Sequence, residues 1–436
     1  MEEVDVLFKK ATCITMVDSK PFCRGQVAVK DGKIYAVGES LKFDAKDSFE
    51  EDLILMPGLV DAHTHAFQVL LRGFVNSKSL TVHPFWLKVL IPFEMSLSEE
   101  EARVSAELSV LNMLKKGTVL YLDAGGPYPE ILAEVSEKAG IKARVTQSTL
   151  DRVKGYERGV EDSLKLIEKY RAGRVKAWLS IRQIMLASEE LMNGIFRLSK
   201  EKGVPVTMHI SEEVSEVEFS LEKWNLRPVE LLNTLGYLGE NLVLAHAAFL
   251  SEDEVDLIAK TKTNVAHCPS VNYPYMNFPK VASLLRKGAN VALGSDGGAF
   301  TSLDMLSEAK VAFSALNGFY GSPYRSIEVS AYDLLKMLTV NGYKALKEEG
   351  SGKISVGYNA DIIALKPGPS LLPLGDPTTI VFYATGGDVK HVIVDGKIVV
   401  RDGRALTLDE EKITEEAQSL RDKVEEKLWK LKLQSA

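Results

Sequence analysis

The pattern of apolar and polar positions changes twice along this chain. Residues 4–38 alternate in the manner of short strands, and the dipeptide Asp31-Gly32 between two such runs predicts a β-hairpin turn. From residue 55 onward, short apolar runs alternate with amphipathic stretches, which is typical of βα units and a parallel sheet. After residue 352 the strand pattern returns, with a second hairpin signal at Asp395-Gly396.

The middle part of the chain contains eight apolar runs separated by helical segments. Eight strands that alternate with helices predict a closed (β/α)₈ barrel of the TIM type. Residues 330–346 predict the helix that ends this part, with Ser330 as its N-cap. The runs are 55–65, 118–124, 142–149, 175–182, 204–210, 242–249, 264–270 and 290–296.

We therefore expect an α/β protein with two domains. The barrel spans residues 55–353, and residues 1–54 and 354–436 form a small β-sandwich domain built from both chain ends, plus a C-terminal helix at 408–433. An apolar stripe along that helix predicts packing against the body of the protein rather than partner binding. The stripe consists of Ile413, Ala417, Leu420, Val424 and Leu428.

Composition and charge exclude several classes of partner. The chain has 436 residues, 45% of them apolar, and a formal net charge of −7 without a block of Lys and Arg. We expect no nucleic-acid partner and no membrane association, and a cytoplasmic location, because no basic leader or long apolar run is visible. The cysteines Cys13, Cys23 and Cys268 do not make a disulfide framework, and whether Cys13 and Cys23 are bridged stays open.

The first apolar run ends in His63-x-His65. Residues two apart on a strand point to the same side, so both imidazoles can face one point beyond the strand end. Neutral imidazole is the commonest protein ligand for divalent transition metals. The pair is consistent with a metal site or, more simply, with two polar residues at a strand end.

Further ligand-type residues lie at or near the ends of later runs: His209, His246, His267 and Asp296. The carboxyl ends of barrel strands meet on the face where barrel enzymes have their active sites. We predict that His63, His65, His209 and Asp296 bind one divalent metal. Three nitrogens and one carboxylate suit Zn²⁺, with Fe²⁺ as the alternative, and leave one position for water.

Three residues are candidates for proton transfer at that metal. Asp296 can accept the water proton, and Glu212, three residues after His209, can protonate a ring nitrogen. His246 lies in an apolar setting and can stabilise charge on oxygen. The simpler alternatives are a turn Asp, a solvated Glu at a helix start and a buried structural His. His267 and Asn272, in the loop after the seventh run, can position substrate.

Together these motifs resemble the amidohydrolase superfamily. The matching stretches are Pro57-Gly-Leu-Val-Asp-x-His63-x-His65, Met208-His209-Ile-Ser-Glu212, Ala245-His246, His267-Cys-Pro-x-x-Asn272 and Gly294-Ser-Asp296-Gly-Gly. The nearest branch is that of the one-metal aminohydrolases, which includes deaminases of S-adenosylhomocysteine, methylthioadenosine, guanine and cytosine, and the triazine hydrolases. The resemblance implies a hydrolase of cyclic amidines that releases ammonia, and homo-oligomers are common among such enzymes.

The resemblance also implies substrate contacts. Glu94 is expected to bind ribose hydroxyls, and Trp86 to wall the pocket. Gln147 and Arg182 stand where adenosine-type members have an Arg and a His, so Arg182 can instead hold a carboxylate or ring carbonyl, as in a guanine- or pterin-type deaminase. A triazine-type hydrolase expelling chloride or alkylamine is the other alternative. A two-metal hydrolase and a non-catalytic binding protein are disfavoured.

Overall fold

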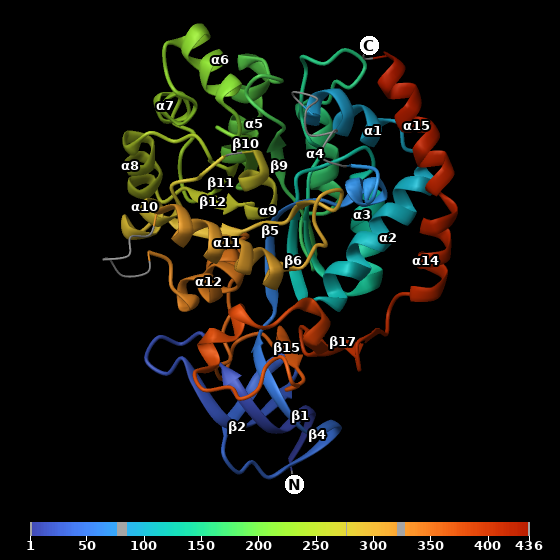
Figure 1. Ribbon diagram of the computed structural model, residues 1–436, viewed down its shortest axis with the longest axis vertical. Coiled ribbons are helices and arrows are strands. Elements are labelled where there is room, and N and C mark those ends of the chain that lie inside the picture. Colours follow the sequence, from blue (N-terminus) through green and yellow to red (C-terminus); the bar gives the residue numbers. More distant parts are fainter. Residues whose placement is uncertain (1, 76–84, 276, 321–327, 435–436) are drawn as a thin grey trace.

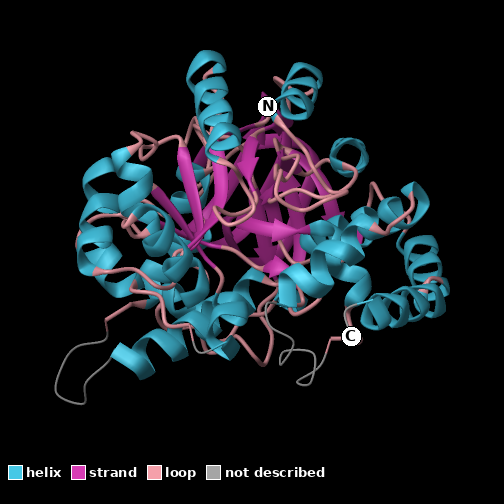
Figure 2. Ribbon diagram, turned by 90° about the horizontal axis from the view of Figure 1, so that it is seen from above, coloured by secondary structure: helices cyan, strands magenta, loops and turns pink. Residues whose placement is uncertain are grey.

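A computed structural model describes residues 2–75, 85–275, 277–320 and 328–434. Strands from both chain ends lie together at one end of the molecule, where blue and orange segments meet in Figure 1. The parallel strands and most helices make up the rest, with the helices arranged around the strands (Figure 2). The α/β class expected from the sequence is confirmed.

The eight apolar runs of the middle part form two five-stranded parallel sheets, with orders β13-β12-β11-β10-β9 and β14-β5-β6-β7-β8. The first run divides at Gly58, and its residues 55–57 belong to the strand before β5. The fourth run becomes β8 and β9, and the eighth becomes β13 and β14. The two sheets are therefore linked through the chain at both of these runs. The strands are β5 Leu59–His65, β6 Thr118–Asp123, β7 Lys142–Val145, β8 Val175–Ala177, β9 Leu179–Ile181, β10 Val206–Ile210, β11 Leu242–His246, β12 Asn264–His267, β13 Asn290–Leu293 and β14 Asp296–Gly297.

Helices follow most of these strands. The predicted N-cap Ser330 accepts a hydrogen bond from the backbone N–H of Asp333, but the helix predicted to end the barrel is divided into α12 and α13 at Thr339. The helices are η1 Ala66–Leu71, η3 Trp86–Leu90, α1 Ile91–Met95, α2 Glu99–Lys115, α3 Pro129–Ala139, α4 Val160–Lys169, α5 Glu189–Lys202, α6 Val214–Trp224, α7 Pro228–Thr234, α8 Glu252–Thr261, α9 Pro269–Asn272, η4 Tyr273–Tyr275, α10 Val281–Arg286, α11 Met305–Tyr320, α12 Ala331–Leu338 and α13 Val340–Ala345.

The chain ends share one mixed eight-stranded sheet of order β18-β17-β16-β15-β4-β1-β2-β3. Both predicted hairpins are present, and Asp31 and Asp395 have φ values of 51° and 48°, the left-handed conformation that this turn requires. The strands are β1 Glu2–Ile14, β2 Phe22–Lys30, β3 Lys33–Gly38, β4 Phe43–Pro57, β15 Ile362–Leu365, β16 Val389–Val394, β17 Lys397–Arg401 and β18 Arg404–Ala405; the helical turns η5 Pro377–Phe382 and η6 Gly386–Asp388 lie between β15 and β16.

The C-terminal segment forms two helices instead of the single helix predicted. They are α14 Glu410–Ser419 and α15 Arg421–Gln434, which run along one side of the part that contains the parallel strands (Figure 1). Nothing in the sequence around Leu420 accounts for the division. Ile413, Leu420, Val424 and Leu428 are buried, so the apolar stripe packs against the body as predicted.

A buried ion cluster joins the parallel strands to the mixed sheet. The ammonium group of Lys142, on β7, lies 2.7 Å from the carboxylates of Asp361 and Asp395 and 3.1 Å from that of Glu348. The Lys142 side chain is 2% exposed. Burial lowers the pKa of this ammonium group, but the three carboxylates outweigh burial and raise it overall, so Lys142 stays charged.

We expect Lys142→Met to lower the free energy of unfolding by about 3–5 kcal/mol, because it leaves buried carboxylates without their counter-charge. Denaturant unfolding of the purified variant measures this. The control is Lys46→Met, which breaks an exposed pair with Asp5 and is expected to cost less than about 1 kcal/mol. Equal losses in the two variants would contradict a special role for the buried cluster.

Candidate metal and active site

The ligand-type residues predicted from the sequence converge from four strands of the two parallel sheets. His63 and His65 come from β5, His209 from β10, His246 from β11 and Asp296 from β14, each near the carboxyl end of its strand. His246 and Asp296 have φ values of 66° and 58°, in the left-handed region that L residues rarely adopt. Such strain persists only where the surrounding structure enforces it, and it is often found at functional sites.

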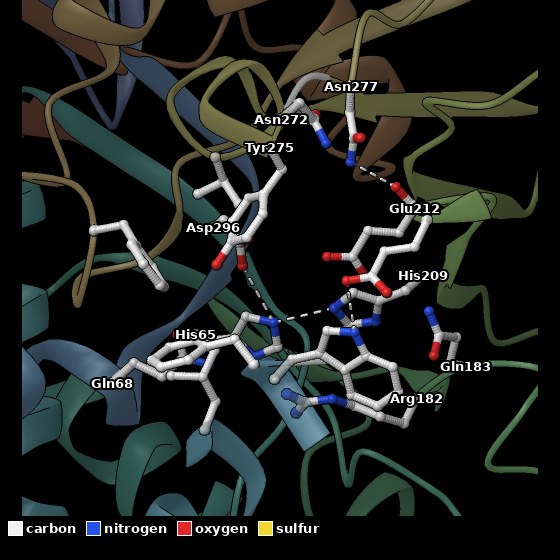
Figure 3. A pocket seen from close by; sticks show the side chains of 16 residues that line it. His65, Gln68, Arg182, Gln183, His209, Glu212, Asn272, Tyr275, Asn277 and Asp296 are labelled. Atoms are coloured by element: carbon white, nitrogen blue, oxygen red, sulfur yellow. Dashed lines mark hydrogen bonds and ion pairs between the residues drawn. The ribbon is translucent and has the colours of Figure 1, made fainter. Parts of the chain in front are cut away.

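Each of His63, His65 and His209 has one ring nitrogen that lies within 4.8 Å of a ring nitrogen of the other two. Nε2 of His65 lies 3.1 Å from Nε2 of His209 and 3.4 Å from Oδ1 of Asp296. Dashed lines mark both contacts in Figure 3. The same carboxylate oxygen is 3.7 Å from Nε2 of His63. Three imidazoles and one carboxylate therefore face a common centre.

The state of these groups fits a bound cation. Burial, followed by neighbouring cationic groups, holds the pKa of His63, His65 and His209 well below the usual range, so the rings are neutral. Both ring nitrogens of His63 are buried without a hydrogen-bond partner among the described residues. Unpaired buried polar atoms are costly, and a cation shared by these atoms is the partner that would remove the cost.

A second layer of side chains holds the metal candidates in place. The carboxylate of Asp61 accepts hydrogen bonds from the backbone N–H of His63 at 3.3 Å, from the backbone N–H of Ser295 at 2.9 Å and from the Ser295 hydroxyl at 2.5 Å. The Thr64 hydroxyl donates to the carbonyl of Asp296 at 2.6 Å. These bonds tie the ends of β5 and β14 together.

Glu212 and His246 lie beside each other next to the histidine cluster. Oε1 of Glu212 is 3.7 Å from Nε2 of His246, whose Nδ1 is 3.3 Å from the amide nitrogen of Asn272. Burial, and then the charge of Glu213, raises the pKa of Glu212 to about 8. Burial also raises the pKa of Asp296 to about 6. A protonated Glu212 beside a more acidic Asp296 suits a proton donor and a proton acceptor in one site.

A cavity of about 640 Å³, its open mouth included, lies over these groups. Three of the predicted substrate contacts, Trp86, Arg182 and Asn272, line it, with the aromatic rings of Phe85, Tyr275 and Phe300.

The other three predicted contacts do not line this cavity. Glu94 is buried and accepts hydrogen bonds from Gln68 at 2.6 Å and from Arg182 at 3.4 Å. Gln147 donates to the carbonyl of Asp162, and His267 contacts the Tyr273 hydroxyl at 3.0 Å. Their roles toward substrate remain predictions. Of the unassigned histidines, His391 pairs with Glu51 in the mixed sheet, and His83 lies outside the described residues.

Several residues at the site were not predicted from the sequence. Gln68, Gln183 and Asn277 line the cavity, and Asp61 supports the metal candidates from behind. Asp61 had a readable signal, because the alternation Asp61-x-His63-x-His65 puts its side chain on the same side of β5 as both histidines. Gln183 had the weaker signal of following Arg182 at a strand end.

Comparison with known proteins agrees with this geometry. The profile of the Amidohydrolase family matches residues 54–399. The chain belongs to this family. A 5-methylthioadenosine/S-adenosylhomocysteine deaminase of Acetivibrio thermocellus is 32% identical, over 94% of this chain and 97% of that protein. A 5'-deoxyadenosine deaminase of Methanosarcina acetivorans is 31% identical, over 95% and 97% of the two chains.

A solved structure shows that the fold of this amidohydrolase is shared. The crystal structure of an adenosine deaminase from Xanthomonas campestris with bound zinc matches with a TM-score of 0.90. The match covers 97% of this chain and 99% of that one at 24% sequence identity. None of the helices in the described part of the chain combines the length and the apolar character needed to span a bilayer.

Proposed function

We propose that this amidohydrolase catalyses the hydrolytic deamination of an amino-substituted nitrogen heterocycle, of the purine nucleoside type that its relatives are named for. The observation that carries the proposal is a set of three buried neutral histidines and Asp296 facing one point, with a protonatable Glu212 beside it. Water would replace the amine on the ring carbon, giving a lactam and ammonia.

His63, His65, His209 and Asp296 would hold one divalent metal, Zn²⁺ or alternatively Fe²⁺. When bound, such an ion lowers the pKa of a water molecule and makes it a nucleophile near neutral pH. Asp296 would accept the proton of that water. Glu212 would donate a proton to the ring nitrogen next to the attacked carbon, and His246, held by Asn272, would stabilise the charge that develops on oxygen.

The arrangement of strands supports a closed barrel at this site. β8 pairs with β7 and β9 with β10, while β13 pairs with β12 and β14 with β5. Since β8 and β9 belong to one run, and β13 and β14 belong to another, the eight runs follow one another around a ring. We propose that residues 55–353 form the (β/α)₈ barrel, and that residues 1–54 and 354–436 form a small β-sandwich domain with the C-terminal helices.

An ammonia-release assay with metal-loaded protein tests the function. The panel contains 5'-methylthioadenosine, S-adenosylhomocysteine, 5'-deoxyadenosine, guanine, pterin and cytosine, and it therefore also separates nucleosides from ring carbonyl substrates. We expect release from at least one of them, with about one metal ion per chain. No release from any of them would contradict the proposal.

Arg182 is expected to bind substrate from the cavity wall. Its Nη1 contacts Glu94 and Ser148, and no partner for its other two nitrogens is found in the described part of the chain. Arg182→Met should raise KM about 10-fold or more, because a hydrogen bond from a charged donor contributes about 1.5–3 kcal/mol. Steady-state kinetics on the best substrate measure this. Arg103→Met, at an exposed position, is the control, and an unchanged KM for Arg182→Met would rule out the contact.

A further inference from the structure

Glu216 is a buried carboxyl group that the proposed reaction does not use. It lies in the first turn of α6, four residues after Glu212, and its side chain is 0% exposed. One of its oxygens, Oε2, accepts hydrogen bonds from the backbone N–H of Glu212 at 3.0 Å and from Nε2 of Gln183 at 3.2 Å. Glu212 and Gln183 both line the cavity. A single carboxyl group thus joins the loops that follow β9 and β10.

The bond to Gln183 determines which way that side-chain amide faces. Because Nε2 donates to Glu216, the amide oxygen Oε1 faces away from Glu216. Gln183 is 2% exposed, and Oε1 is buried without a hydrogen-bond partner in the described ranges. Figure 3 shows Gln183 near Glu212 and Arg182 at the cavity. An unpaired buried acceptor costs about 1–3 kcal/mol. Because Gln183 lines the cavity, an N–H group of a bound substrate is a partner that would remove this cost.

The bond to Glu212 fixes the main chain of the proton donor. Ser211, the residue before Glu212, has a φ of 48°, in the left-handed region. The side-chain amide nitrogen of Asn277 donates to the backbone carbonyl of Glu212 at 2.8 Å. The peptide groups around Glu212 are therefore held by Glu216 and Asn277 from two directions. A displacement of about 1 Å at a reacting group can lower the rate about 100-fold.

Helix capping alone is the simpler interpretation of Glu216. A Glu at the third helical position commonly accepts a hydrogen bond from an N–H just before the helix. That interpretation explains the bond to Glu212, but it does not require complete burial or a bond to Gln183 from another loop. Burial raises the pKa of Glu216 to about 8 despite the N–H of Glu212, so an uncharged amide of the same shape can replace it.

We propose that Glu216 is a positioning residue that holds Glu212 beside the reacting carbon and presents the amide oxygen of Gln183 to an N–H donor of the substrate. The kinetic part of this inference rests on the proposed function, because it takes Glu212 as the proton donor. The arrangement of Gln183 and Glu212 around Glu216 is independent of the activity.

Two substitutions at Glu216 separate the effect of its hydrogen bonds from the effect of its side-chain size. Glu216→Met keeps the size but removes the acceptor, and we expect kcat to fall about 10- to 100-fold and KM to rise about 10-fold. Glu216→Gln keeps an acceptor oxygen and should restore both constants to within about 3-fold of wild type. Glu218→Gln, at an exposed position on the same helix, is the matched control and should behave as wild type.

Gln183→Met tests the route to the substrate. It should raise KM about 10-fold and change kcat little, since Glu212 stays in place. In the Gln183→Met background, Glu216→Met should lower kcat but raise KM no further, because two residues that act through one contact are not additive. A further increase in KM in the double variant would overturn the link between Glu216 and Gln183.

Crystal structures of the metal-loaded wild type, Glu216→Met and Glu216→Gln provide a readout that does not depend on turnover. We expect Glu212 and the Gln183 amide to move only in Glu216→Met. Unmoved side chains there, or a lower melting temperature with unchanged kcat and KM, would show that Glu216 only caps the helix.

If Glu216→Met does not fold, an unchanged KM for Gln183→Met overturns the proposal. If wild type releases no ammonia from the panel, the proposed function fails, and the crystal structures still decide on the positioning.

Discussion

Replacement of Glu212 by Gln is expected to lower kcat about 1,000-fold and to change KM little. General acid–base catalysis contributes about 10²- to 10⁴-fold, and the amide keeps the shape of the side chain while it cannot transfer a proton. Nε2 of His246 lies 3.7 Å from Oε1 of Glu212, and burial lowers the pKa of this imidazole, so it is a poor substitute donor. Steady-state kinetics at saturating substrate measure the loss.

The pH dependence gives this prediction a second readout. Burial raises the pKa of Glu212 to about 8, and the protonated form is the one that donates. The wild-type kcat should therefore fall as the pH rises through this pKa, and Glu212→Gln should lack that decrease. Glu222→Gln, at an exposed position on α6, should keep the wild-type rate and profile. A Glu212→Gln variant with more than about a tenth of the wild-type kcat would remove Glu212 from the mechanism.

The candidate metal ligands were easier to predict than the candidate substrate contacts. Strand ends could be read from apolar runs, and His63, His65, His209 and Asp296 each stand at the end of such a run. The parallel strand arrangement that was inferred from alternation brings them together. Substrate contacts depend on side-chain directions within loops. Glu94, on α1, accepts hydrogen bonds from Gln68 and Arg182, which no sequence spacing indicates, and its expected role at the ribose stays a prediction.

Breaks within strands and helices could not be predicted from the sequence either. The fourth run was predicted as one strand, but it divides at Trp178 so that one half pairs with β7 and the other with β10. The C-terminal helix divides at Leu420 without a Pro or Gly to signal it. In both cases the two halves contact different elements, since α14 lies against α2 and α15 against α1. The hairpin turns at Asp31 and Asp395 were predicted correctly because their backbone conformation is a local property of Asp-Gly.

Removal of the metal is expected to abolish activity and to lower thermal stability. Chelation, or the substitution His209→Ala, should reduce kcat/KM about 1,000-fold or more, because the ion supplies several kcal/mol of transition-state stabilisation. A ligand that binds only the folded state at 1,000 times its Kd adds about 4 kcal/mol, so the melting temperature of the metal-free protein should fall measurably. Elemental analysis should give about one ion per chain for wild type and much less for His209→Ala.

The control for this prediction is His391→Asn, since His391 lies in the mixed sheet and pairs with Glu51. It should retain the metal and the activity. In His209→Ala the two rings of β5 and the carboxylate of Asp296 still face each other, but three donors hold the ion less tightly than four. Added Zn²⁺ should therefore restore part of the melting temperature before it restores turnover. Full activity of the chelated protein would show that the buried histidines have a purely structural role.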